Sequence, residues 1–239
     1  MDRLLVALDV DTGSAARALA ERLRGVVGGF KIGGRLFTSE GPRLVEELAG
    51  RGDRVFLDLK FHDIPNTVAG AVAAATRLGV WMVNVHAGGG SAMMRAARAA
   101  AIDEASRASR TPPLVIAVTI LTSMDEAALR EIGVASSMGE QVERLAALAQ
   151  DAGLDGVVAS PQEISIVRRR CGERFAIVTP GIRGPADKKD DQARTLGAAE
   201  ALAAGASYLV VGRPIIAATD PREAAERIAA ECRASVPAE

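Results

Sequence analysis

The residue types best suited to acid–base chemistry are concentrated in one short segment, 58–67, whose sequence is D-L-K-F-H-D-I-P-N-T. Residues two apart in a β-strand point to the same face, so Asp58 and Lys60 are expected on one side of a strand end. Asp63 follows just beyond them. A surface ion pair is the simplest alternative. Because charges placed next to an apolar run lose hydration and cost stability, the pattern favours a functional charged cluster.

The elements that must hold this cluster are short β-rich runs that alternate with longer helical patterns. Eight runs are recognised: Leu4–Leu8, Val27–Ile32, Val55–Leu59, Trp81–His86, Leu114–Ile120, Gly156–Ala159, Phe175–Thr179 and Tyr208–Val211. Strands that are apolar on both faces and alternate with amphipathic helices predict a parallel sheet covered by helices. Eight such units in 239 residues match an α/β fold of the (β/α)8 TIM-barrel type, with residues 1–239 as one domain.

The helical segments carry boundary signals of their own. Ser137 and Glu140 make a capping-box pattern, and apolar residues repeat at helical spacing over 142–149. Four glycines precede predicted strands by a few residues, as helix C-caps do: Gly52, Gly79, Gly153 and Gly205. A doubly wound open sheet is the main alternative, but the segment after the first run lacks the G-x-G-x-x-G fingerprint expected there.

In a barrel of this kind, catalytic residues lie at the C-terminal ends of the strands. Asp9 ends the first predicted strand, although a helix N-cap uses the same residue type. Lys31 ends the second, inside an apolar run where an unpaired lysine is costly. His86 ends the fourth and is more often structural than catalytic in such a place. Thr122 follows the fifth, where its hydroxyl can cap a helix or bind a ligand.

The last two strands are followed by an anion-binding pattern. Arg183 lies in the P-G-I-R-G segment after the seventh strand, and Gly212 and Arg213 follow the eighth. Loops at these two places are the usual phosphate site of such barrels, and arginine grips phosphate through several donors. The polar stretch 184–191 is either a plain solvated loop or a lid over a phosphorylated ligand. We expect a phosphate at one side of the barrel mouth and the charged cluster at the other.

Composition argues against several classes of partner. A net charge of −1 and an aromatic content of 3% argue against nucleic acid and against an anionic membrane surface. No apolar run approaches the roughly 20 residues of a membrane span, and no signal peptide is recognised, so a cytoplasmic protein is expected. The two cysteines and the lack of histidine pairs at ligand spacing argue against a transition metal. The residues alone leave proton transfer, decarboxylation, isomerisation and aldol chemistry on a sugar phosphate open.

Taken in chain order, these motifs resemble the orotidine 5′-phosphate decarboxylase family. The resemblance rests on the segment 58–67 and on five shorter motifs: Leu8-Asp9, Phe30-Lys31-Ile32-Gly33, Leu121-Thr122-Ser123, Pro180-Gly181-Ile182-Arg183 and Val211-Gly212-Arg213. It implies a barrel that works as a homodimer and uses no metal or organic cofactor. It also implies conversion of orotidine 5′-phosphate to UMP and CO2, the last step of de novo pyrimidine synthesis.

The same resemblance implies a role for each site residue. Lys60 is expected to protonate C6 of the pyrimidine, with Asp58 against the departing carboxylate and Lys31 in the same charge network. The remaining roles are ribose binding (Asp9 and Lys31), contact with the pyrimidine edge (Thr122), phosphate binding (Arg183, Gln192, Gly212 and Arg213), a bridge from phosphate to base (Gln192), and donation to the neighbouring subunit's site (Asp63 and Thr67).

Two alternatives remain open at this point. A metal-dependent 3-keto-L-gulonate 6-phosphate decarboxylase resembles this chain in its D-x-K-x-x-D block, but has an acid where Lys31 stands here. A non-catalytic barrel that binds a nucleotide as a sensor or scaffold is the alternative from another class. Intact Lys60 and both aspartates of the block argue against it.

Overall fold

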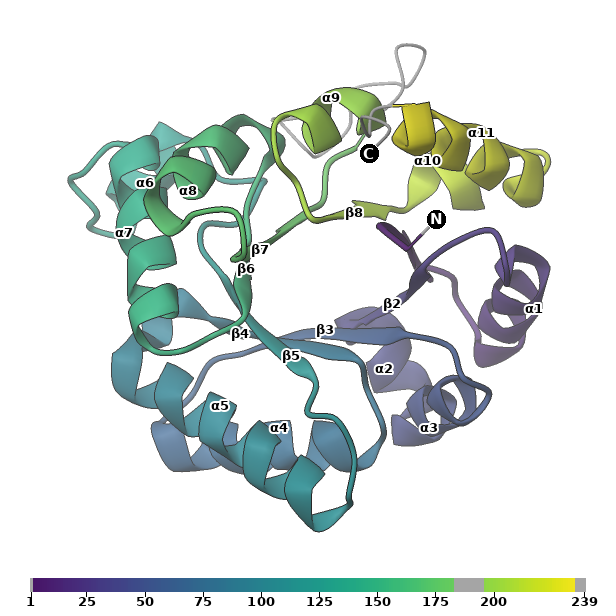
Figure 1. The fold of residues 1–239 in the computed structure, drawn as a ribbon, viewed down its shortest axis with the longest axis horizontal. Coiled ribbons are helices and arrows are strands. Elements are labelled where there is room, and N and C mark those ends of the chain that lie inside the picture. Colours follow the sequence, from purple (N-terminus) through teal and green to yellow (C-terminus); the bar gives the residue numbers. More distant parts are fainter. Residues whose placement is uncertain (1, 183–195, 235–239) are drawn as a thin grey trace.

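The protein, described here by a computed structural model over residues 2–182 and 196–234, is a closed barrel of parallel strands with helices outside it (Figure 1). The strands follow one another around the barrel in chain order, and β8 pairs with β1 to close it. The predicted (β/α)8 TIM barrel is therefore confirmed. Its strands are β1 (Leu4–Ala7), β2 (Gly29–Gly33), β3 (Val55–Phe61), β4 (Met82–His86), β5 (Leu114–Val118), β6 (Gly156–Val158), β7 (Ala176–Thr179) and β8 (Tyr208–Val211).

Helices fill the connections between the strands, and some connections contain two. The α-helices are α1 (Gly13–Leu23), α2 (Gly34–Glu40), α3 (Pro42–Gly50), α4 (Pro65–Arg77), α5 (Gly90–Arg107), α6 (Glu126–Glu131), α7 (Met138–Asp151), α8 (Ile164–Cys171), α9 (Ala198–Ala203), α10 (Arg213–Ile216) and α11 (Pro221–Ala234). Short 3₁₀ helices, η1 (Ala87–Gly89) and η2 (Pro161–Glu163), precede α5 and α8. None of the helices in the described residues has the length and apolar character needed to cross a membrane.

The helix ends follow the signals in the sequence. Ser137 caps α7, and its N–H donates to Glu140 Oε2 at 2.9 Å, which completes the predicted capping box. The predicted C-cap glycines all adopt the left-handed conformation that a Cβ disfavours, with φ of 88° at Gly52, 80° at Gly79, 81° at Gly153 and 107° at Gly205. These turns return the chain to the N-terminal ends of the strands.

The alternation of side chains along the strands creates two separate apolar regions. In β1, Leu4 and Val6 join the large core between the strands and the helices, whereas Leu5 and Ala7 join a smaller cluster inside the barrel. The inner cluster is completed by buried residues of the other strands: Phe56, Met82, Ile116, Val178 and Val210. These side chains fill the barrel interior, so it is a packed apolar plug beneath the C-terminal ends of the strands and not a pore.

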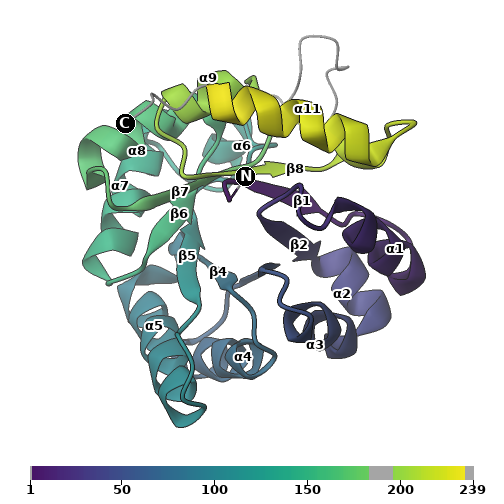
Figure 2. The ribbon, with the colours of Figure 1, turned by 45° about the vertical axis from the view of Figure 1, so that its right-hand side comes forward.

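The last helix secures the closure of the barrel. α11 packs against α1 and α9, and so covers the seam where β8 meets β1 (Figure 2). The first and last elements of the described chain therefore contact each other, through the pairing of β1 with β8 and the packing of α1 against α11.

The predicted strand ends differ from the observed ones by a few residues, and the most informative difference is in β3. This strand runs on to Phe61, and its register against β4 shifts between Leu57 and Phe61. Lys60, within the shift, has a φ of 52°. Regular strand alternation therefore does not hold there, although Asp58 and Lys60 do meet as predicted.

Candidate active site

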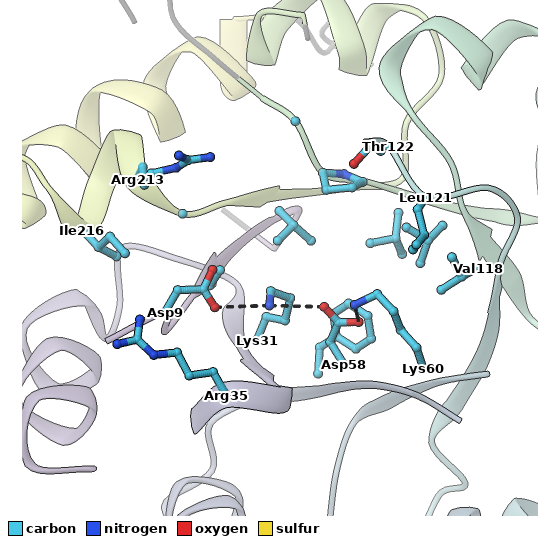
Figure 3. Close-up of a pocket in the computed structure, with 18 of the residues that line it drawn as sticks. Asp9, Lys31, Arg35, Asp58, Lys60, Val118, Leu121, Thr122, Arg213 and Ile216 are labelled. Carbon is cyan, nitrogen blue, oxygen red and sulfur yellow. Dashed lines mark hydrogen bonds and ion pairs between the residues drawn. The ribbon is translucent and has the colours of Figure 1, made fainter. Parts of the chain in front are cut away.

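The C-terminal ends of the strands surround a cavity of about 440 Å³ at the barrel mouth. Its floor includes Ala7, Phe56, Val178 and Val210, so the cavity lies directly on the apolar plug. Its charged lining comes from strand ends, a loop and the starts of two helices: Asp9, Lys31, Arg35, Asp58, Lys60 and Arg213 (Figure 3).

Lys31 stands between two carboxylates at the centre of this cavity. Its Nζ lies 3.2 Å from Asp58 Oδ2 and 3.5 Å from Asp9 Oδ1. On the far side of Asp58, Lys60 Nζ lies 2.7 Å from Asp58 Oδ1. The four groups form an alternating charge row, Asp9–Lys31–Asp58–Lys60, which Figure 3 shows from left to right. The side chains of Lys31 and Asp58 are each only 12% exposed, and mutual pairing offsets part of their lost hydration.

The backbone turns Lys60 into the charge row with a conformation that is uncommon for a residue with a Cβ. A left-handed backbone costs about 1–2 kcal/mol for such a residue. The neighbouring strand supports it, because the Lys60 N–H donates to Asn84 Oδ1 at 2.8 Å. Asn84 Nδ2 in turn donates to Asp58 Oδ1 at 2.7 Å, and Asn84 is fully buried.

A glycine at the end of β2 leaves room for the ammonium of Lys31. A Cβ added to Gly33 would lie 3.1 Å from Lys31 Nζ and 3.7 Å from Asp9 Oδ1. The first of these distances is tighter than an ordinary van der Waals contact, so a larger residue would push on the centre of the charge row. The motif Phe30-Lys31-Ile32-Gly33 therefore has a steric reason for ending in glycine.

The charge row keeps Asp58 ionised in spite of its burial. Burial alone raises the pKa of the Asp58 carboxyl, but the ammonium groups of Lys31 and Lys60, together with hydrogen bonds from Lys60 and Asn84, outweigh it and hold the pKa below its ordinary value. At neutral pH the cavity therefore contains a fixed carboxylate with an ammonium on each side.

Apolar side chains form the wall beside these charges. The ends of β5 and β6 and the loop after β5 contribute Val118, Ile120, Leu121 and Val158. A wall of this kind lowers the local dielectric, so that charge–charge interactions in the cavity are stronger than in water. Thr122, predicted to contact a ligand, also lines the cavity.

The predicted anion-binding residues are only partly within the described residues. Gly212 and Arg213 line the cavity after β8, and Figure 3 places Arg213 on the Asp9 side, away from Lys60. Arg183, Gln192 and the segment 184–191 lie outside the described residues. The observed arrangement places the guanidinium of Arg213 towards the Asp9 end of the charge row, with Lys60 at the other end.

Two predicted site residues lie away from the cavity wall. Asp63 and Thr67 are both exposed and do not line the cavity; Asp63 Oδ1 accepts a hydrogen bond from the Ile64 N–H at 2.6 Å. Ile64 itself is 66% exposed. The structure of one chain therefore does not bring Asp63 and Thr67 to the charge row.

His86, the other residue singled out at a strand end, does not line the cavity either. Its ring stacks on that of His62 with centroids 5.4 Å apart. Burial, with further contributions from His62 and Lys60, lowers the pKa of His86 below its ordinary value. This geometry agrees with the structural interpretation of His86.

Sequence reasoning missed two residues of the site. Asn84 stands out in the sequence as an amide inside the apolar run 82–85. Its hydrogen-bond partners, Asp58 and Lys60, lie on β3, so the sequence around Asn84 does not reveal them. Arg35, at the start of α2, lines the cavity and forms an ion pair with Asp11. Nothing in the sequence around Arg35 indicated either contact.

Known proteins resemble this chain over nearly its whole length. Residues 2–228 match the sequence profile described as "Orotidine 5'-phosphate decarboxylase / HUMPS family". The chain belongs to this family. Among proteins named orotidine 5′-phosphate decarboxylase, that of Moorella thermoacetica is 56% identical over 231 residues, which cover 96% of this chain and 92% of the relative. That of Syntrophotalea carbinolica is 53% identical over 234 residues, covering 98% and 96%.

A solved member of the family shares the fold closely. The crystal structure titled orotidine 5′-phosphate decarboxylase from Lactobacillus acidophilus matches with a TM-score of 0.86 at 38% identity, covering 96% of this chain and 98% of that one. Family membership and barrel geometry thus agree. Within residues 2–182 and 196–234, no three His, Cys, Asp or Glu side chains come together as metal ligands do.

The charge row predicts a titration that can be measured directly. Because its pKa is lowered, the Asp58 carboxylate contributes stability above the ordinary aspartate pKa and loses it as the pH falls through the folded value. In a ¹³C NMR titration, the Asp58 carboxyl should have a midpoint below that of an ordinary aspartate, because its pKa is lowered. The Lys60→Met variant should have a higher midpoint, because one ammonium and one hydrogen bond are removed. Arg95→Met, which changes an exposed residue of α5, serves as control; an unchanged Asp58 midpoint in Lys60→Met would contradict the prediction.

Proposed function

We propose that this protein decarboxylates orotidine 5′-phosphate to UMP and CO2. The observation that carries the proposal is the alternating charge row, with Lys60 at one end, in a cavity whose other side holds Arg213. Relatives that are more than half identical over nearly the whole chain bear the name of this activity. We also propose that the enzyme works in the cytoplasm, as its biosynthetic family and composition favour.

The reaction breaks the bond between C6 of the pyrimidine and its carboxylate carbon. CO2 departs, and the bonding electron pair stays on C6 in the plane of the ring, where the π-system delocalises it poorly. Lys60 is proposed to stabilise this charge with its ammonium and then to transfer a proton to C6. The product is UMP, and the neutral lysine regains its proton from solvent before the next turnover.

Asp58 is proposed to face the carboxylate that leaves. Two carboxylates at close range disfavour the bound substrate more than the transition state, because the substrate's charge moves away from Asp58 as CO2 forms. The lowered pKa of Asp58 supports this role, since a protonated acid would not repel the substrate.

The remaining contacts would hold the substrate so that C6 of the pyrimidine lies at the Lys60 ammonium. We assign the ribose hydroxyls to Asp9 and Lys31 and the pyrimidine edge to Thr122. The phosphate is assigned to Gly212 and Arg213, together with Arg183 and Gln192. Binding energy from a phosphate remote from C6 can position the ring for the reaction.

The metal-dependent sugar-phosphate decarboxylase has less support. In that group an acid takes the place of Lys31, whereas here an ammonium at this position pairs with Asp58 and Asp9. A non-catalytic nucleotide-binding barrel would have no use for a lysine held in a left-handed conformation beside a buried carboxylate. Independence from metal and organic cofactors remains a prediction of the proposal.

We further propose a homodimer in which each subunit completes its neighbour's site. Asp63 and Thr67 would then lie over the partner's cavity, which agrees with their exposure and with the exposed Ile64 beside them. Asp63, the third charged residue of the D-x-K-x-x-D block, would thus be supplied in trans.

The first experiment measures turnover. The purified protein in excess EDTA should convert orotidine 5′-phosphate to UMP, followed by ultraviolet absorbance, and Lys60→Ala should lose this activity because C6 has no proton donor. Thermal unfolding of Lys60→Ala establishes that the variant is folded. Failure of the folded wild type to convert the substrate in EDTA would contradict the proposal, and recovery on addition of a divalent cation would favour the metal-dependent alternative.

Removal of the phosphate contact gives a second prediction. Arg213→Ala should lower kcat/KM about ten- to a hundredfold, mostly through KM, because a hydrogen bond to a charged group is worth about 1.5–3 kcal/mol. The matched control is Arg95→Ala, which removes an exposed arginine on α5. An unchanged KM in Arg213→Ala would remove Arg213 from the phosphate site.

The shared site predicts complementation between inactive variants. Asp63→Ala and Lys60→Ala should each be nearly inactive alone, whereas subunit exchange creates hybrid dimers with one intact site. Random mixing should restore about a quarter of the wild-type activity per subunit. The absence of recovery, in a mixture shown by mass spectrometry to contain hybrids, would mean that each site is built from one chain.

A further inference from the structure

Asn84 occupies an unusual position in the barrel wall. It lies in the middle of β4, has 0% exposure, and is flanked by Val83 and Val85. A buried amide in an apolar run is costly unless each of its polar groups has a partner. Asn84 meets this requirement through two hydrogen bonds, and both go to residues of the charge row.

The first hydrogen bond replaces part of the strand ladder. The register of β3 against β4 shifts between Leu57 and Phe61, and Lys60 lies within the shift. Its N–H donates to Asn84 Oδ1 at 2.8 Å, a side-chain acceptor. The left-handed φ of 52° that directs Lys60 into the cavity is therefore held by a side chain of the next strand.

The second hydrogen bond orients the carboxylate beside Lys60. Asn84 Nδ2 donates to Asp58 Oδ1 at 2.7 Å, and the same oxygen accepts from Lys60 Nζ at 2.7 Å. The orientation of the amide is unambiguous, because the oxygen must face the Lys60 N–H and the nitrogen must face the carboxylate. Among residues of this size, an amide offers both an acceptor and a donor in these directions whatever the pH.

We propose that Asn84 is a positioning residue, which sets the Lys60 ammonium and the Asp58 carboxylate in the relative placement that the reaction needs. This inference rests on the proposed decarboxylation. Asn84 does not line the cavity, so it would act through Lys60 and Asp58 and not by touching the substrate. Misplacement of reacting groups by about 1 Å can cost about a hundredfold in rate.

A merely structural amide would behave differently from a positioning residue. Loss of a structural hydrogen bond lowers the stability of the protein but leaves the turnover number of the folded fraction unchanged. Loss of positioning lowers kcat while the affinity for UMP, which the ribose and phosphate contacts provide, stays near its wild-type value. The split between kcat and binding thus separates the two roles.

The experiment compares two substitutions with a matched control. Asn84→Ala removes both hydrogen bonds and should lower kcat about a hundredfold, with less than a threefold change in the Kd for UMP measured by calorimetry. Thr119→Val is the control, because Thr119 is also buried at the barrel wall and its Oγ1 donates to the carbonyl of Val158 at 3.0 Å, away from the charge row. Its kcat should stay close to that of the wild type.

Asn84→Asp tests the donor separately. It keeps an acceptor for the Lys60 N–H but places a second carboxylate against Asp58. The charged neighbours of Asp58 are the ammonium of Lys60 and that of Lys31, which also pairs with Asp9. His86, whose ring stacks on His62, lies two residues further along β4. Like charges at this distance raise the pKa of one acid. The introduced carboxyl group, when protonated, can donate to Asp58 as the amide does, so kcat relative to the wild type should be highest at acid pH and fall as the pH rises.

The outcomes decide between the roles. A folded Asn84→Ala with wild-type kcat, or with its defect confined to UMP affinity, overturns the inference. If Asn84→Ala does not fold, the isosteric Asn84→Asp decides, and a kcat ratio to wild type that does not vary with pH overturns it. A wild-type protein that does not convert orotidine 5′-phosphate would instead refute the proposed function, before any variant is compared.

Discussion

The central constraint on this protein is the burial of alternating charges at the mouth of an apolar barrel. Lys31 and Asp58 are almost out of contact with water, and neither would be stable there without the other. The apolar side chains inside the barrel fill the space beneath these charged groups, and the strands that carry the groups fix the distances between them. Stability and chemistry therefore depend on the same contacts, since removing one member leaves its neighbour uncompensated.

The remaining architecture can be understood as support for that row. Gly33 leaves space for an ammonium, and Asn84 links β4 to the displaced backbone of β3. Arg213 lies towards the Asp9 side of the cavity, away from Lys60, so the proposed phosphate binding and bond breaking are assigned to the ends of different strands. In the proposed function, this separation would let a remote anionic group be bound without a change in the ion pairs around Asp58.

Much of this could be predicted from the sequence, because the signals were local. Strand runs, glycine caps and the motif around Lys31 need only neighbouring residues, and the barrel follows from eight repeated units. The left-handed backbone at Lys60 could not be predicted, because a register shift depends on how two strands pair. Asn84 was missed for the same reason, since its partners are 24 and 26 residues away. Asp63 does not reach the cavity of its own chain, and its proposed place over a partner's cavity rests on the family resemblance and not on any local pattern in the sequence.

The left-handed conformation of Lys60 has a consequence for the evolution of this barrel. Glycine or asparagine would adopt that backbone with less strain than lysine does. Backbone strain alone would therefore favour glycine or asparagine at position 60, whereas the pairing of the Lys60 ammonium with Asp58 and its proposed catalytic role favour lysine. In descendants that have lost the proposed activity, the catalytic reason for lysine is gone, and position 60 should be among the first site residues to change. The residue at this position would therefore distinguish active from inactive descendants.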